Sequence, residues 1–167
     1  AEKGDCLITL ENILAHSEGQ VFIFQPPDKL DTTFAKVLER FAARAPGNVY
    51  VAASYAYHGR NRERIARLAD FCARQGVPIV ATNDVLYHTQ ERRPLQDVLT
   101  CIRTHCTIEQ AGYRLEANAE RHLKSPDEMA RLFKGFEPAL PRTVKLAERC
   151  HFSLDDLSYA YPDEPVT

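Results

Sequence analysis

The sequence lacks three features, and each absence narrows what the protein can do. It has no excess of positive charge: the formal net charge is −2, so any contact with DNA requires a local basic patch. It has no signal peptide and no apolar run near the roughly 20 residues that cross a bilayer, so we expect no membrane partner. It also has no repeats or low-complexity segments. We therefore expect the chain to form one ordinary globular domain.

Paired cysteines are missing too. The five cysteines are odd in number, and none forms a CxxC pair. This pattern favours reduced thiols in a cytoplasmic protein over a disulfide framework. Cys101 and Cys106, with His105 between them, could hold a metal only if another pair completed the site. We therefore interpret them as small packed side chains.

What the sequence does contain is an alternation of strands and helices. With 167 residues and 44% hydrophobic content, the chain can bury one core. Apolar runs predict strands at 21–24, 48–54 and 77–81, the first of them buried, with helices at 31–43 and 60–75 between them. Strand and helix in alternation predict an α/β fold with a parallel sheet.

The second half of the chain has the periodicity of helices. A short helix begins near Thr9, and longer ones are expected at 92–103 and 139–150. The run Ser125-Pro126-Asp127-Glu128 predicts another helix start, with a capping box between Ser125 and Glu128. The α/β part is thus followed by a helical carboxyl-terminal portion.

Polar side chains follow the third predicted strand, in the run Asn83-Asp84-Val85-Leu86-Tyr87-His88. The carboxyl ends of parallel strands are where ligands usually bind. Asp84 and His88 are ligand types that suit zinc or manganese. The alternative is a polar turn, in which Asn83 and Asp84 bond the backbone while His88 packs on the next helix.

Two small basic groups could contact nucleic acid or a partner protein. Arg92 and Arg93 begin a predicted helix that also carries Arg103, and Arg121 and Lys124 precede the capped helix. Arginine and lysine at such positions can bind phosphates. The alternative is a solvated helix face, which is the commoner role of surface charge.

Three segments resemble a known family. Residues 77–85, Val-Pro-Ile-Val-Ala-Thr-Asn-Asp-Val, are similar to the last metal motif of the PHP (polymerase and histidinol phosphatase) domain of bacterial polymerase III alpha subunits. Residues 92–103 and 115–124 resemble the error-prone branch of this C-family of DNA polymerases. The likeness extends from Ala1 to Glu164.

The resemblance implies a fold and a domain order. Residues 1–90 would form the carboxyl-terminal part of a distorted, seven-stranded PHP-type α/β barrel, residues 91–152 its helical extension, and residues 153–167 a linker toward the polymerase core. The natural protein would be several times longer than this chain.

The resemblance also implies a function for that longer protein. It would be a damage-induced, translesion DNA polymerase, a nucleotidyltransferase that takes part in DNA repair and replication in the cytoplasm. DNA would be its substrate and magnesium its metal, and other mutagenesis or replication proteins would be partners. No polymerase carboxylates are expected within residues 1–167, so this part alone would not be catalytic.

The chain departs from the metal motifs of active PHP domains. It has Asp84-Val85-Leu86 where those domains have Asp-x-His, and Ala52 where replicative relatives have a carboxylate. A His-x-His motif is expected before residue 1, and His58 is displaced from its family position. We therefore expect a degenerate, structural module that holds no metal tightly, with Asp84, His88 and His58 as remnants of a site.

The alternative is an active metal-dependent phosphoesterase, a proofreading exonuclease or a pyrophosphatase. It would bind zinc or manganese, with its other ligands upstream of residue 1. If no metal is bound, the Asp84 carboxylate should accept hydrogen bonds from the turn backbone or from an arginine, because an unpaired buried charge is costly. Arg92 and Arg93 are the arginines nearest in the sequence.

Overall fold

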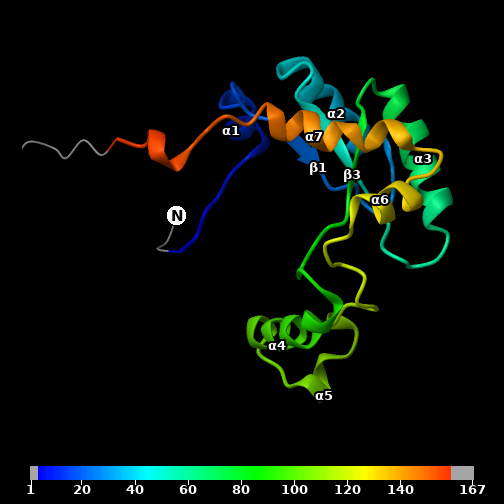
Figure 1. The fold of residues 1–167 in the computed structure, drawn as a ribbon. Coiled ribbons are helices and arrows are strands. Elements are labelled where there is room, and N and C mark those ends of the chain that lie inside the picture. The colour runs from blue at the N-terminus through cyan, green and yellow to red at the C-terminus, as the bar shows by residue number, and fades with distance from the viewer. Residues whose placement is uncertain (1–3, 159–167) are drawn as a thin grey trace, which may run out of the picture.

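A parallel sheet forms the centre of the molecule (Figure 1). The computed structural model describes residues 4–158. Its strands are β1 (Phe22–Phe24), β2 (Val49–Ser54) and β3 (Ile79–Thr82), paired in the order β1-β2-β3. All pairs are parallel, with Val51 opposite Ile79. The predicted parallel α/β arrangement is confirmed, and within residues 4–158 it has three strands rather than seven.

The predicted helices agree with the structure to within about two residues, and α5 is a short helix that the sequence did not predict. They are α1 (Leu10–Ala15), α2 (Thr32–Arg44), α3 (Asn61–Arg74), α4 (Arg93–Thr104), α5 (Ile108–Ala111), α6 (Pro126–Leu132) and α7 (Pro141–Glu148). Short 3₁₀ turns occupy Gln90–Arg92, Gly112–Arg114, Glu137–Ala139 and Leu154–Asp156. Part of the predicted linker, residues 159–167, lies outside the described residues. No described helix is long and apolar enough to span a membrane.

The first strand is less buried than predicted. Ile23 is half exposed, while Phe22 and Phe24 pack on the core from the other face. The reason is that β1 lies at the edge of the sheet and pairs with β2 alone. The apolar run at residues 21–24 therefore predicted the strand correctly. Its predicted burial was wrong, because one face of the strand is exposed.

Ser125 starts α6 as expected, but without the full capping box. Its hydroxyl accepts the Glu128 backbone N–H at 3.2 Å. The Glu128 carboxylate, however, accepts hydrogen bonds from Arg131 at 2.7 and 2.8 Å instead of returning to the Ser125 N–H. A charged donor three residues along the helix competes successfully with the backbone.

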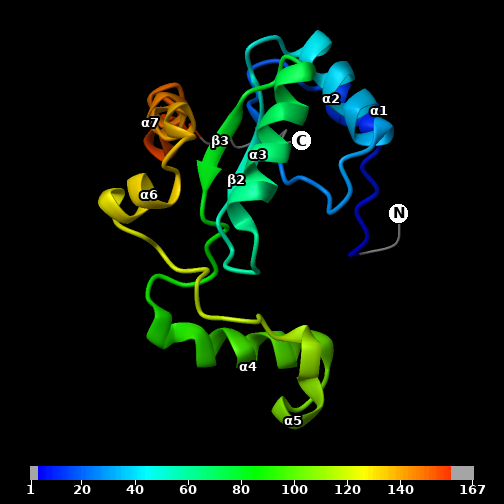
Figure 2. The ribbon, with the colours of Figure 1, turned by 90° about the vertical axis from the view of Figure 1, so that its right-hand side faces the viewer.

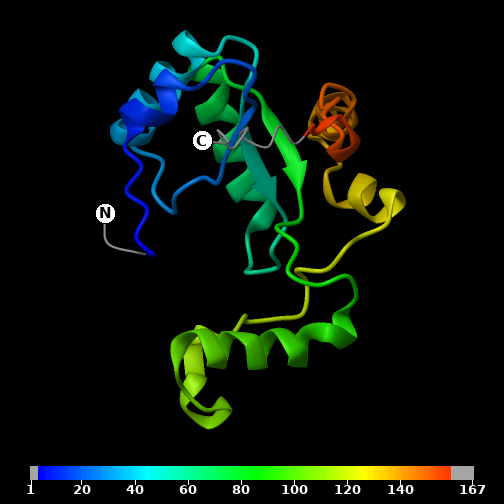
Figure 3. The same cartoon turned by 90° about the vertical axis from the view of Figure 1, so that its left-hand side faces the viewer.

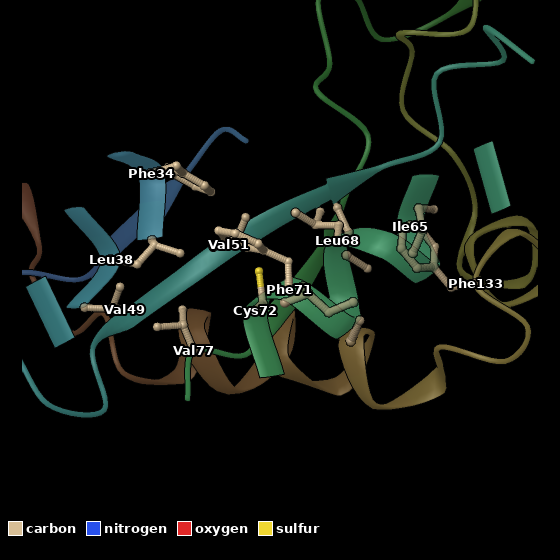
Figure 4. Close-up of a cluster of buried hydrophobic side chains, with 14 of the residues drawn as sticks. Phe34, Leu38, Val49, Val51, Ile65, Leu68, Phe71, Cys72, Val77 and Phe133 are labelled. Atoms are coloured by element: carbon tan, nitrogen blue, oxygen red, sulfur yellow. The ribbon is translucent and has the colours of Figure 1, made fainter. Parts of the chain in front are cut away.

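The main core lies between the sheet and helices α2 and α3 (Figure 4). Its largest buried side chains include Leu38 and Phe41 from α2, Ile65 and Cys72 from α3, and Val51 from β2. Phe133, which follows α6, is fully buried in the same cluster. The helices after residue 125 therefore return to the sheet and complete its core.

Helix α7 covers the free edge of β3. It lies beside β3, away from α2 (Figure 2). Arg142 donates from Nη1 to the Ile79 carbonyl at 2.9 Å. This bond occupies a backbone acceptor on the open side of β3, which would otherwise be available to another strand.

Helices α4 and α5 form a separate lobe, residues 90–114, that lies away from the sheet (Figures 1 and 3). Two chain segments, residues 83–89 and 115–124, connect this lobe to the rest of the molecule, and we call them the neck. They run side by side: the Leu86 and Tyr87 N–H groups both donate to the Arg121 carbonyl, at 2.8 and 3.3 Å. The neck begins where β3 ends, which places it at the carboxyl edge of the sheet.

Candidate functional site

A cavity of about 250 Å³ opens at the carboxyl edge of the sheet. Side chains from the ends of β2 and β3, from the loop before α3 and from the neck line it, including Ser54, His58, Asn83, Asp84, Glu116 and Arg121. The Ser54 and Thr82 hydroxyl groups lie 2.7 Å apart beside it and link the two strand ends. This hollow lies just after the third strand, beside the polar run that begins at Asn83 and Asp84.

Arg121 makes the most contacts in this cavity. Its Nη2 lies 2.7 Å from Asp84 Oδ2 and its Nη1 lies 2.6 Å from Glu116 Oε1. Its Nε also donates to the Asp84 carbonyl at 2.7 Å. The Arg121 side chain is 22% exposed, whereas those of Glu116 and Asp84 are 30% and 46% exposed, so these contacts are partly open to water. We call Asp84, Glu116 and Arg121 the arginine clamp.

The expected arginine partner of Asp84 is confirmed, but its identity was wrong. The partner is Arg121, which comes 37 residues later in the chain and forms an ion pair with the Asp84 carboxylate at 2.7 Å, and not Arg92 or Arg93. Burial was also overestimated, since the Asp84 side chain is 46% exposed. Asp84 sits at φ +44°, in the left-handed region that short polar side chains tolerate better than most. The turn therefore projects its carboxylate toward the second neck segment.

Asn83 strengthens the same junction. Its amide nitrogen donates to the Glu120 carbonyl at 3.2 Å and also to the His122 carbonyl. Asn118 in turn donates to the Ala56 carbonyl at 3.0 Å, which ties the neck to the loop after β2. Most polar groups around the cavity thus hold one segment of chain against another.

The two histidines of the predicted remnant site are separated. His58 lines the cavity together with Asp84. His88 lies instead in a different hollow of about 220 Å³ at the base of α4, next to Leu86 and Leu99. The turn after Asp84 and the pairing of Leu86 and Tyr87 with Arg121 carry His88 away, so His88 does not replace the missing imidazole.

The described residues do not fit the metal cluster that the PHP resemblance implies. Nowhere in residues 4–158 do three or more His, Cys, Asp or Glu side chains gather closely enough to hold a metal ion. A guanidinium already lies between the two carboxylates of the cavity. Because Arg121 supplies a fixed positive charge where a cation would bind, we derive no metal chemistry for this site.

Three of the four predicted basic contact residues make internal contacts. Arg121 belongs to the clamp, and Arg93 donates to the Glu116 carbonyl at 2.6 Å. Lys124, whose side chain is 2% exposed, pairs with Glu120 at 2.9 Å. Arg92 is exposed, and within residues 4–158 it forms no ion pair. Contact of these residues with DNA or a partner stays a prediction.

A second group of charges brings the loop before α3 onto α6. The Tyr57 hydroxyl donates to Glu128 at 3.3 Å, and the Lys124 ammonium lies 5.5 Å from the centre of the Tyr57 ring. The hydrogen bonds from Arg131 lower the pKa of Glu128 to about 2. Burial, and then the negative charge of Glu128, raise the pKa of Tyr57. These contacts hold the N-terminal turn of α6 against the loop between β2 and α3.

All five cysteines are free thiols, and Cys101 and Cys106 lie close enough to interact through their side chains. Cys72 and Cys101 are buried, which confirms the interpretation of Cys101. Burial raises the pKa of the Cys72 thiol to about 11. The hydrogen bond to Thr104 lowers the pKa of Cys106, which is half-buried.

Sequence reasoning missed Glu116, Asn83 as a bridge, and the Ser54–Thr82 pair. Glu116 and Arg121 lie five residues apart in a segment without helical periodicity, and opposite charges so placed were a usable signal. The link between Asn83 and the second neck segment had no such signal. It depends on the path of the intervening lobe.

The chain is similar to bacterial polymerases over nearly its whole length. It is 55% identical over 166 residues to an error-prone DNA polymerase of Caulobacter vibrioides, covering 99% of this chain and 15% of that relative. The error-prone DNA polymerase of Bradyrhizobium diazoefficiens is 49% identical over 166 residues, 99% of this chain and 14% of its own length. That of Brucella abortus is 47% identical over 167 residues, 99% and 15% respectively.

These relatives are several times longer than the chain. It spans about 15% of the length of the curated relatives that it matches. No family model matches the sequence. The similarity is therefore to one region of these polymerases.

Proposed function

We propose that this chain is part of an error-prone DNA polymerase, a DNA nucleotidyltransferase that copies damaged templates. Identities of 47–55% to proteins of that name, over nearly all of the chain, carry the proposal. The long protein would take DNA as its substrate and magnesium as its catalytic ion. Damage-induced mutagenesis, cytoplasmic location and association with other mutagenesis proteins belong to the same proposal.

Primer extension by the full-length protein tests this assignment. We expect magnesium-dependent extension on an undamaged template and on one with an abasic site, with frequent misincorporation. Failure to extend any primer, by a protein that is folded and monodisperse, would refute the assignment.

Within that protein, we propose that residues 1–167 act as a degenerate PHP-type module with a structural role. The arginine clamp carries this proposal, because Arg121 forms ion pairs with the Asp84 and Glu116 carboxylates and also donates to the Asp84 carbonyl. Leu86 and Ala52, which cannot bind a metal, support it. The remaining strands of the seven-stranded barrel would come from outside the described residues.

An active phosphoesterase is the competing function, and one observation favours it: His58 and Asp84 line the same cavity. Release of nucleotides from a DNA 3′ end, or of phosphate from pyrophosphate, separates the two. The structural proposal predicts that full-length Asp84→Asn and wild-type protein show the same background level. Hydrolysis by the wild type that disappears in Asp84→Asn, with primer extension intact, would establish the phosphoesterase instead.

A further inference from the structure

Helix α4 turns its apolar side away from the molecule. Leu95, Val98, Leu99 and Ile102 recur at helical spacing and are 54%, 46%, 51% and 65% exposed. We call these four residues the α4 stripe. One isolated exposed leucine needs no explanation, whereas a continuous stripe on one helix face marks an interaction surface.

The opposite side of α4, which faces the rest of the lobe and the neck, is polar. Arg93 donates to the Glu116 carbonyl at 2.6 Å, and the side chains of Thr100 and Cys101 are buried on this side. An amphipathic helix normally buries its apolar face. Here the inward contacts are made by Arg93, Thr100 and Cys101, and within residues 4–158 the larger apolar side chains of the α4 stripe stay exposed.

The stripe continues into hollows on both sides. Leu95 and Leu99 line the hollow of about 220 Å³ that also contains Leu86. Val98 and Ile102 line another, of about 550 Å³, that reaches Ile108 on α5. Leu86 and Ile108 are themselves exposed. The surface is therefore a ridge with a groove on each flank, a shape that accepts an apolar helix or strand.

We propose that the α4 stripe docks against an apolar face of the same polypeptide, in the region outside residues 1–167. This inference rests on the proposed function, because it assumes a chain of the relatives' length. In those relatives, about 15% of the length corresponds to this chain, so most of the polypeptide is available to cover the stripe.

The size of the stripe favours a tethered partner over a second copy. Four half-exposed aliphatic side chains present on the order of a few hundred Å², whereas a standard interface between separate proteins buries about 800 Å² on each partner. A segment of the same chain avoids most of the entropy cost of association, and its effective concentration is high. A small apolar surface is then sufficient.

Photo-crosslinking in the full-length protein tests the proposal. Val98 is replaced by p-benzoylphenylalanine, and Arg67, exposed on α3, receives the same probe for comparison. We expect the Val98 probe to crosslink within one molecule to a peptide from outside residues 1–167. A crosslink that joins two molecules, or one confined to the lobe and neck, would overturn the proposal.

A second variant tests release of the lobe. Leu95→Asp with Leu99→Asp in the full-length protein should increase the rate of protease cleavage in the neck at least tenfold. Arg67→Asp, a charge change at an exposed site, should leave that rate unchanged. Equal cleavage rates in the wild type and the double variant would contradict docking.

Primer extension by the same preparations separates this proposal from the one it rests on. A protein that extends primers but gives no intramolecular crosslink from Val98 refutes the docking alone. A protein that gives the crosslink but extends no primer refutes the polymerase assignment and leaves the docking in place.

Discussion

At the scale of single residues, Arg121 has the most consequential position in this molecule. It joins a turn at the end of β3 to the returning neck segment through Asp84 and Glu116. A planar guanidinium can donate to two carboxylates and a carbonyl at once, which an ammonium cannot do with the same geometry. The polar side chains of this cavity therefore hold the two neck segments together.

We predict that Arg121→Met weakens the neck. Losing the clamp leaves two carboxylates near each other without a cation, at a cost of roughly 1–3 kcal/mol. Amide exchange at Leu86 and Tyr87, which donate to the Arg121 carbonyl, should then be about 5- to 100-fold faster. In Arg121→Lys the exchange rate at these amides should lie between those of the wild type and Arg121→Met. Arg67→Met, at an exposed position, should leave the rate unchanged. Unchanged exchange at Leu86 in Arg121→Met would contradict the clamp.

A pH titration examines a second residue-scale contact, between Glu128 and Arg131. The hydrogen bonds from Arg131 lower the pKa of Glu128 from 4.5 to about 2. A depressed pKa in the folded state means that the contact stabilises α6 fully above pH 4.5, and that this stabilisation is lost as the pH falls toward 2. The side-chain carboxyl resonance of Glu128 should titrate near pH 2, and at a higher pH in Arg131→Gln, in which Tyr57 and Lys124 still lower its pKa. A wild-type midpoint of 4 or above would refute this.

Residue-level prediction from the sequence succeeded where the signal was local. The need to pair a carboxylate indicated an arginine partner for Asp84, which the structure provides. The sequence could not say which arginine, because the path of residues 85–120 through the neck and lobe decides what returns to Asp84. It also could not place His88, whose position depends on the turn at Asp84 and on neck pairing.

At the scale of elements, periodicity predicted the strands and helices because it is a local property. The apolar spacing in α2 and α3 indicated both the helices and the faces that pack on the core. The same spacing indicated α4 but gave no information on what covers its apolar face. Which side of α4 faces inward is decided by the neck, through Arg93 and Glu116.

The start of α6 provides a prediction at this scale. Ser125→Ala removes the acceptor of the Glu128 N–H and should destabilise the helix end by about 1 kcal/mol. The Glu128 amide should then exchange about fivefold faster. Ser125→Asp, which keeps a capping oxygen, should exchange like the wild type. An equal increase in both variants would show that the cap is not the cause.

At the scale of the whole molecule, the sheet with its helices buries most of its apolar side chains, whereas the α4–α5 lobe exposes an apolar face. The βα core is covered by α2 and α3 on one face of the sheet and by α7 at the β3 edge (Figure 2). The α4–α5 lobe has its polar side toward the neck and its apolar side outward. Such a body suits a module inside a longer protein, held together by internal ion pairs and joined to other regions through an apolar surface.

The central claim is that the cavity at the carboxyl edge is held by Arg121 and not by a metal. Metal content of the full-length protein, measured by mass spectrometry after dialysis without chelator, tests this most directly. The account predicts that wild-type and Asp84→Asn proteins contain the same zinc and manganese, far below one equivalent per chain. One or more equivalents of either metal in the wild type, lost in Asp84→Asn, would contradict it.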